Sequence, residues 1–180
     1  MPIIATDVLM GPVELFTAPF GTTEPANATV APAAAWIAAG GTQEGLRQII
    51  NQTYTPKVVD ELGMPVGAKL TELSVQMATA LAEARLANFR LALNQAAAAT
   101  TKLELNGVLT NGEPGYVSVL ARGFGPNGLR RNVIIRKALS SESVESTYSK
   151  ANQTFVPITW SGYFVSESIA AFLIDDTQGA

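Results

Sequence analysis

Cysteine and histidine are both absent from the 180 residues of this chain. Without cysteine, the chain has no disulfides, thiolate zinc sites or thiol nucleophiles. Without histidine, it lacks the usual general base, the Ser-His pairing and most transition-metal ligands. Charged residues are also scarce, at 15% against 47% apolar residues. Such a composition is unusual for a soluble monomer and favours a chain whose surface is mostly interface.

Long hydrophobic runs are missing as well. No stretch approaches the roughly 20 apolar residues of a membrane span, and the N-terminus lacks the basic start and apolar run of a signal peptide. The net charge of -3 argues against a general nucleic-acid binder. We therefore expect a soluble protein made inside a cell. The length predicts a single domain over 1–180, with a less regular N-terminal segment at 1–32 and a short polar tail at 175–180.

The stretch 70–95 organises the chain, because it changes period in its middle. Its first half alternates like a strand with one buried face: Leu73, Val75, Met77 and Leu81 point one way, and Glu72, Ser74 and Gln76 the other. From about 84 to 94 the period becomes helical, with a core-facing stripe of Leu86, Phe89 and Leu93 and a remaining surface of Arg85, Asn88, Arg90 and Asn94. We expect Phe89 to anchor this helix on the sheet and Asn94 to end it.

Residues 55–69, TPKVVDELGMPVGAK, precede that strand and read as a long loop. The loop joins a strand over 46–54 to the strand that begins at Leu70, so it lies at the end of a long hairpin. A loop of this length inside a compact domain is usually functional or ordered by a partner. We expect a subunit-interface loop whose exposed apolar contacts are Val59, Leu62, Met64 and Val66.

The rest of the chain is predominantly β. Strands are expected at 13–17, 116–121, 129–138, 155–164 and 171–174, with turns at Asn106-Gly107, Asn111-Gly112 and Pro126-Asn127-Gly128. The total is seven or eight strands and one clear helix. This pattern predicts a mainly β fold, an antiparallel β-sandwich or barrel-like domain with one flanking helix.

Three motifs that suggest binding chemistry have simpler readings. Residues 123–128, GFGPNG, match the dinucleotide pattern G-x-G-x-x-G, but Pro126 and a following β-branched strand replace the helix that the motif requires. Asp60-Glu61 and Asp175-Asp176 are each only two adjacent carboxylates, so solvated loop charge is the preferred interpretation over a cation site. The basic cluster is either a phosphate-contacting patch or a set of strand charges that pair with acidic residues of this or a neighbouring subunit, and we favour the second. Its members are Arg122, Arg130, Arg131, Arg136 and Lys137. We find no catalytic constellation and expect no enzyme activity, no cofactor and no metal.

Three segments resemble the major tail tube proteins of long-tailed bacteriophages. They are DELGMPVGAK, the strand-to-helix stretch TELSVQMATALAEARLANFRLALN, and the closing QTFVPITWSGYFVSESIAAFLIDD. Together they cover about half of the chain, and the order of strands over the rest is compatible. Residues 1–32 match least.

The resemblance implies a subunit that assembles into hexameric rings, which stack into a hollow tube. In such tubes the inner strands join into one continuous barrel around the channel. The implied partners are further copies of the chain, a tape-measure protein, and tail terminator and tail-tip proteins. DNA passes through the channel without specific binding, and no membrane is involved. The implied location is the virion tail, with assembly in the host cytoplasm.

The channel wall is expected to be polar and not positive, because DNA must slide along it. Glu72, Ser74 and Gln76 share a polar side by the two-residue period, so we expect them to face the lumen. The competing assignment directs this side outward to solvent. Two other functions remain open: a ring- or trimer-forming virion protein, such as a head-decoration or tail-terminator protein, and a small binding module or enzyme.

Overall fold

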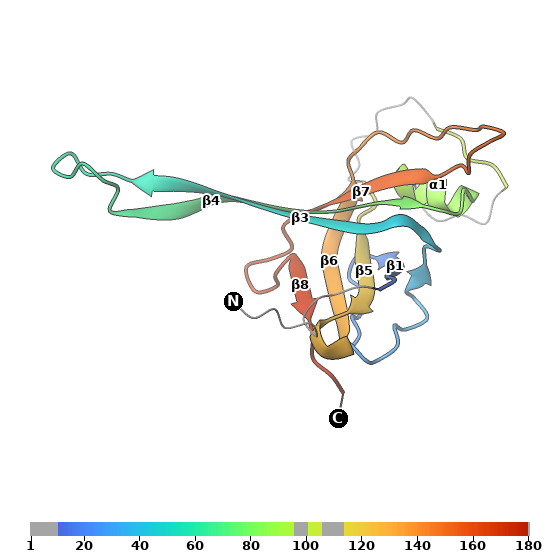
Figure 1. Ribbon diagram of the computed structural model, residues 1–180, viewed down its shortest axis with the longest axis horizontal. Coiled ribbons are helices and arrows are strands. Elements are labelled where there is room, and N and C mark those ends of the chain that lie inside the picture. The colour runs from blue at the N-terminus through green and yellow to red at the C-terminus, as the bar shows by residue number, and fades with distance from the viewer. Residues whose placement is uncertain (1–10, 96–100, 106–113, 180) are drawn as a thin grey trace.

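The computed structural model describes residues 11–95, 101–105 and 114–179, which form one curled antiparallel β-sheet and one short α-helix (Figure 1). The elements are β1 (Glu14–Pro19), β2 (Ile37–Ala38), β3 (Thr42–Lys57), β4 (Gly67–Leu81), α1 (Leu86–Ala92), β5 (Val117–Phe124), the 3-10 turn η2 (Pro126–Gly128), β6 (Arg130–Ser140), β7 (Val156–Gly162) and β8 (Phe172–Asp175). The strand order is β2-β1-β5-β6-β7-β4-β3, and β8 pairs with β6. The predicted mainly β, barrel-like fold with one helix is confirmed, with all described strands in a single curled sheet rather than two stacked ones. The expected turns at Asn106-Gly107 and Asn111-Gly112 lie outside the described residues.

The core is built from side chains that alternate along the central strands. Met77 on β4 lies directly opposite Trp160 on β7, and both are fully buried. The larger cluster is built mainly by residues of β4, β5, β6 and β7. A smaller cluster forms around Leu120 and Ile134, where Trp36 covers the sheet from the segment between β1 and β2.

The helix confirms part of the prediction for 84–94 and corrects its buried face. Asn94 follows the helix with a positive φ of 54°, as expected for a helix stop. Asn88, however, is buried rather than on the outer surface, because its side-chain amide donates to the Ala39 and Glu83 carbonyl oxygens. Burial is acceptable for this polar side chain since both donors are satisfied. Phe89 packs on the core cluster but is only partly buried, so it shares the anchoring with Ala92.

The long hairpin is present, but its loop is shorter than expected. The β3–β4 ladder continues to the pair Lys57 and Gly67, so the connecting loop covers 58–66 rather than 55–69. The residues that the ladder adds, 55–57 and 67–69, are exposed on both sides and show no alternation of apolar and polar side chains. Without that alternation, the sequence pattern does not distinguish this part of the strands from a loop.

The two terminal segments are tied to the sheet by specific contacts. Within 11–32, β1 pairs with β5, and the residues after it run irregularly over the sheet. At the other end, the Gln178 side chain bonds both backbone groups of Arg130, and the Thr177 carbonyl accepts from the Ala28 amide. The polar residues 176–179 therefore continue the line of β8.

Candidate interaction surface

A two-stranded ribbon leaves the body of the protein and extends far beyond it (Figure 1). Strand β7 pairs with β4 only from Gln76 to Leu81. The remainder of β4, Gly67 to Val75, pairs with β3 alone. At about 3.3 Å per residue, the ribbon is about 30 Å long from Gln76 to Gly67. We call this segment, residues 48–76, the ribbon.

A β-bulge fixes which side chains share each face of the ribbon. Thr53 pairs with Glu72, whereas the next residue, Tyr54, pairs with Leu70, so Thr71 is an extra residue on β4. Directly opposed residues of an antiparallel pair point to the same side. The bulge therefore brings Leu70 onto the side that carries Leu73, despite their odd spacing of three.

The apolar face of the ribbon continues the core-facing side of the sheet into solvent. Its body end is Val75, which is buried, but the residues farther out are exposed: Ile50, Tyr54, Leu70 and Leu73. Leu73, which we expected to face the core, is 56% exposed because it lies beyond the end of β7. No described part of the chain covers this face.

The opposite, polar face carries the residues predicted to line a lumen. Glu72, Ser74 and Gln76 share this side. Ser74 accepts from Asn51, and Gln76 donates to Ser161. The same side also carries Lys57 and Lys69 toward the tip, by the alternation of β3 and the pairing of Thr55 with Lys69. Ile49, which pairs with Gln76, also lies on this side. The face is therefore mostly polar, with acidic charge at Glu72 and basic charge toward the tip. The lumen assignment itself stays a prediction.

The tip of the ribbon, residues 58–66, combines apolar and acidic side chains. The predicted interface residues Val59, Leu62, Met64 and Val66 are all exposed, as is Val58. Two hydrogen bonds shape the tip: the Val66 amide donates to the Lys57 carbonyl at 2.8 Å, and the Leu62 amide to the Val59 carbonyl at 3.2 Å. The structure thus presents the apolar side chains far from the core that would otherwise bury them.

Both long edges of the ribbon have unpaired backbone groups. Strand β3 is last in the sheet order, so its outer edge pairs with no described strand. The inner edge of β4 is likewise open from Gly67 to Val75. Open edges of this length are templates for pairing with another chain.

The basic cluster is distributed among internal contacts. Arg131 and Asp176 form a bidentate pair at 2.6 Å, which lowers the pKa of the Asp176 carboxyl and raises the pKa of the Arg131 guanidinium. Arg136 pairs with Glu24, and buried Arg122 donates to the Ala28 carbonyl. Two of the five cations thus pair with carboxylates of this chain, as the preferred interpretation expects.

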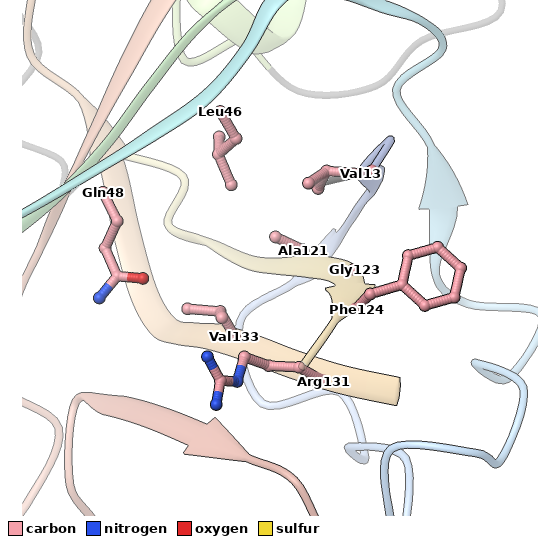
Figure 2. A pocket seen from close by; sticks show the side chains of 9 residues that line it. Val13, Leu46, Gln48, Ala121, Gly123, Phe124, Arg131 and Val133 are labelled. Atoms are coloured by element: carbon pink, nitrogen blue, oxygen red, sulfur yellow. The ribbon is translucent and has the colours of Figure 1, made fainter. Parts of the chain in front are cut away.

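One shallow cavity of about 210 Å³ lies between β3 and the strands β5 and β6 (Figure 2). Figure 2 shows Leu46 and Gln48 on β3 above Ala121, Val133 and Arg131. Arg131 is its charged side chain, and Asp176 already engages it. The described residues contain no group of three or more acidic side chains placed to hold a metal ion. In this cavity we find no pairing of nucleophile and base.

Turn η2 replaces the phosphate-binding helix that the pattern at 123–128 would need. Asn127 and Gly128 both have positive φ, at 58° and 72°, and β6 follows directly. These glycines therefore serve a turn between two strands.

No helix in the described part of the chain has both the length and the apolar character to cross a bilayer. No protein-family model and no curated protein matches this chain.

Proposed function

We propose that this protein is a structural subunit that polymerises through the ribbon into stacked hexameric rings, forming a hollow tube such as a bacteriophage tail tube. One observation carries the proposal: a ribbon about 30 Å long, with an exposed apolar face that no described part of the chain covers. An exposed apolar surface of this kind marks an interaction site in a soluble protein. Each of its large side chains contributes about 1–2 kcal/mol when a partner completes its burial.

The open edges supply a way to join copies. In this arrangement the outer edge of β3 in one copy pairs with the inner edge of β4 in the next. Since β3 and β4 are antiparallel within each copy, this contact is antiparallel as well and continues the alternation of strands around a ring. The interface is head-to-tail, and a ring that closes leaves no free edge.

The two faces of the ribbon then take different environments. Pairing edge to edge keeps all polar faces on one side, so Glu72, Ser74 and Gln76 line the channel and the apolar faces pack outward on neighbouring subunits. Lys57 and Lys69 lie on this same side, nearer the tip. Around Glu72, Ser74 and Gln76 the wall is polar and not positive, which suits DNA that must pass without sticking. Tape-measure, terminator and tail-tip proteins are the further partners of such a tube.

Negative-stain electron microscopy of the purified protein tests the proposal. Hollow filaments are the expected result. Isolated rings would instead favour a head-decoration or terminator protein, and monomers at all concentrations would contradict self-assembly.

Two neighbouring positions on β4 provide a matched pair of variants. Leu73→Asp places a charge on the apolar face and should abolish filaments, whereas Ser74→Asp places the same charge on the polar face and should leave them. Both side chains lie on the ribbon, away from the buried core, so both variants should fold. Equal behaviour of the two variants would remove the apolar face from the interface.

A further inference from the structure

A row of three aromatic rings and one lysine crosses the sheet where the ribbon leaves the body. Tyr116 and Tyr163 meet edge to face, with ring centroids 5.6 Å apart. The Lys137 ammonium lies 4.2 Å from the Tyr116 centroid and 5.6 Å from that of Phe20. The four side chains come from β6 and from the ends of β1, β5 and β7. We call this row the aromatic platform.

The platform is partly open to solvent and contains one cation, Lys137. Phe20 is 45% exposed and Tyr163 is 39% exposed. Among the residues that the structure describes, no carboxylate lies within ion-pair distance of Lys137, in contrast to Arg131 and Arg136. Exposed Tyr and Phe side chains are among those enriched at protein interfaces.

The tip of the ribbon is complementary to this platform in charge and in polarity. Residues 58–66 contain Asp60 and Glu61 and no basic residue, and these two carboxylates stand among the five exposed apolar side chains described above. Met64, the most exposed of these five at 77%, has the flexible thioether that packs well against aromatic rings. The tip thus supplies carboxylates and flexible apolar side chains, and the platform supplies a cation and aromatic rings.

The two complementary surfaces of one molecule are kept apart by the ribbon itself. Tyr163 directly follows β7, whose Ser161 pairs with Gln76 at the root of the ribbon. The tip lies about 30 Å away at the far end of a continuous two-stranded ladder. Contact between tip and platform therefore has to join different copies, and such a head-to-tail contact repeats from subunit to subunit.

We propose that the tip of the ribbon in one copy docks on the aromatic platform of another copy, with Asp60 and Glu61 facing Lys137. This inference rests on the proposed self-assembly and names the acceptor surface for it. The docking covers the exposed rings and pairs the Lys137 ammonium with carboxylates of the incoming tip. The contact is separate from the pairing of ribbon edges and supplies a second link between subunits.

Charge exchange between the two surfaces tests the docking. Lys137→Glu, and separately Asp60→Lys with Glu61→Lys, should each raise the concentration needed for assembly about tenfold, because each places like charges against one another. Combining the three substitutions restores opposite charges and should return assembly close to that of the wild type. Lys150→Glu, an identical change at an exposed position in the loop before β7, is the control and should have no such effect.

The outcomes separate this inference from the function on which it rests. Wild-type filaments that Lys137→Glu leaves unchanged, or a combined variant no better than its parents, would overturn the docking and leave self-assembly standing. A wild type that never assembles would overturn both. If Lys137→Glu fails to fold, Lys137→Met keeps the stem and removes the charge. In the Lys137→Met background, neutralising the tip by Asp60→Asn with Glu61→Gln should not raise the concentration needed for assembly any further. A further increase would contradict the pairing.

Discussion

Asn94 shows how much one side chain contributes at the end of α1. Its side chain accepts a hydrogen bond from the Ser140 amide at 2.8 Å and donates to the Ser140 carbonyl at 2.7 Å. The residue also adopts a positive φ, which asparagine tolerates better than most residues. Asn94 therefore ends the helix and joins it to the end of β6 at the same time.

Two substitutions separate these roles. Asn94→Gly keeps the backbone conformation and loses both hydrogen bonds, so it should lower the free energy of unfolding by about 1–3 kcal/mol. Asn94→Ala loses the same bonds and also strains the backbone, so it should lower that free energy by about 1 kcal/mol more. Urea unfolding followed by circular dichroism measures both values. Equal stability of the two variants would show that the positive φ carries no cost.

Asp176 makes stability depend on pH through its pair with Arg131. The folded-state pKa of Asp176 is depressed below its ordinary value of 3.8, so the carboxylate stabilises the fold above that value and loses this effect as acid protonates it. The pair is partly exposed to solvent, so its contribution is at most about 1 kcal/mol.

The matching variant is Asp176→Asn. Its deficit in unfolding free energy relative to wild type should be constant at neutral pH and shrink as the pH falls below about 4. Thermal melts at a series of pH values supply the measurement. A deficit that stays the same at pH 3 would mean that the charge does not contribute.

At the scale of elements, the bulge at Thr71 accommodates the odd spacing of Leu70 and Leu73 on the apolar face of the ribbon. Deleting Thr71 removes the extra residue and makes the ladder regular, so Thr53 can still pair with Glu72 and Tyr54 with Leu70. Leu70 then stays on the apolar face. Filaments should still form, and the melting temperature should change little since this region is exposed on both sides.

Thr71→Ala is the control for the deletion, since it keeps the register and removes only the hydroxyl that bonds the Thr53 carbonyl and Thr55. It should form filaments as well. Loss of filaments from the deletion variant alone would show that the ladder does not become regular and that the bulge itself is needed for assembly.

The same elements show how far the sequence predicts the structure. Alternation located the inner parts of β4 and β7, where one side is buried, and the change of period located α1. The outermost ladder residues, 55–57 and 67–69, escaped prediction because neither of their sides meets a core. The bulge was not predicted either, because nothing in the sequence around Thr71 indicates an extra residue. Asn88 was assigned to the surface because its two backbone acceptors, Ala39 and Glu83, are positioned only by the folded chain.

The exposure of the apolar residues at the tip was easier to predict than the bounds of the loop. The apolar residues of 58–66 stood out beside two glycines and two carboxylates, and all are exposed in the structure. The aromatic platform was not predicted, because its residues come from four separate segments. Only the pairing of β1, β5, β6 and β7 brings Phe20, Tyr116, Lys137 and Tyr163 together.

At the scale of the whole molecule, substitutions of Glu72 test whether the polar face of the ribbon faces the channel. Its side chain is exposed and on the polar face of the ribbon, so Glu72→Lys should leave folding and filament formation largely intact. In a phage that carries this variant, six-fold repetition of the lysine would attract DNA to the wall and slow its ejection. Glu72→Gln removes the charge without reversing it and should have a smaller effect. Ejection at the normal rate from Glu72→Lys tubes would exclude Glu72 from the lumen.

Hydrogen–deuterium exchange of the ribbon tests the central claim most directly. In dilute monomer the outer-edge amides of β3, the inner-edge amides of β4 between 67 and 75 and the amides of the tip should exchange rapidly, because they have no strand beside them. In the assembled protein, pairing with neighbouring copies should protect these same amides while the buried core strands change little. Equal exchange of the ribbon in both samples, or a protein that stays monomeric at every concentration, would contradict assembly through the ribbon.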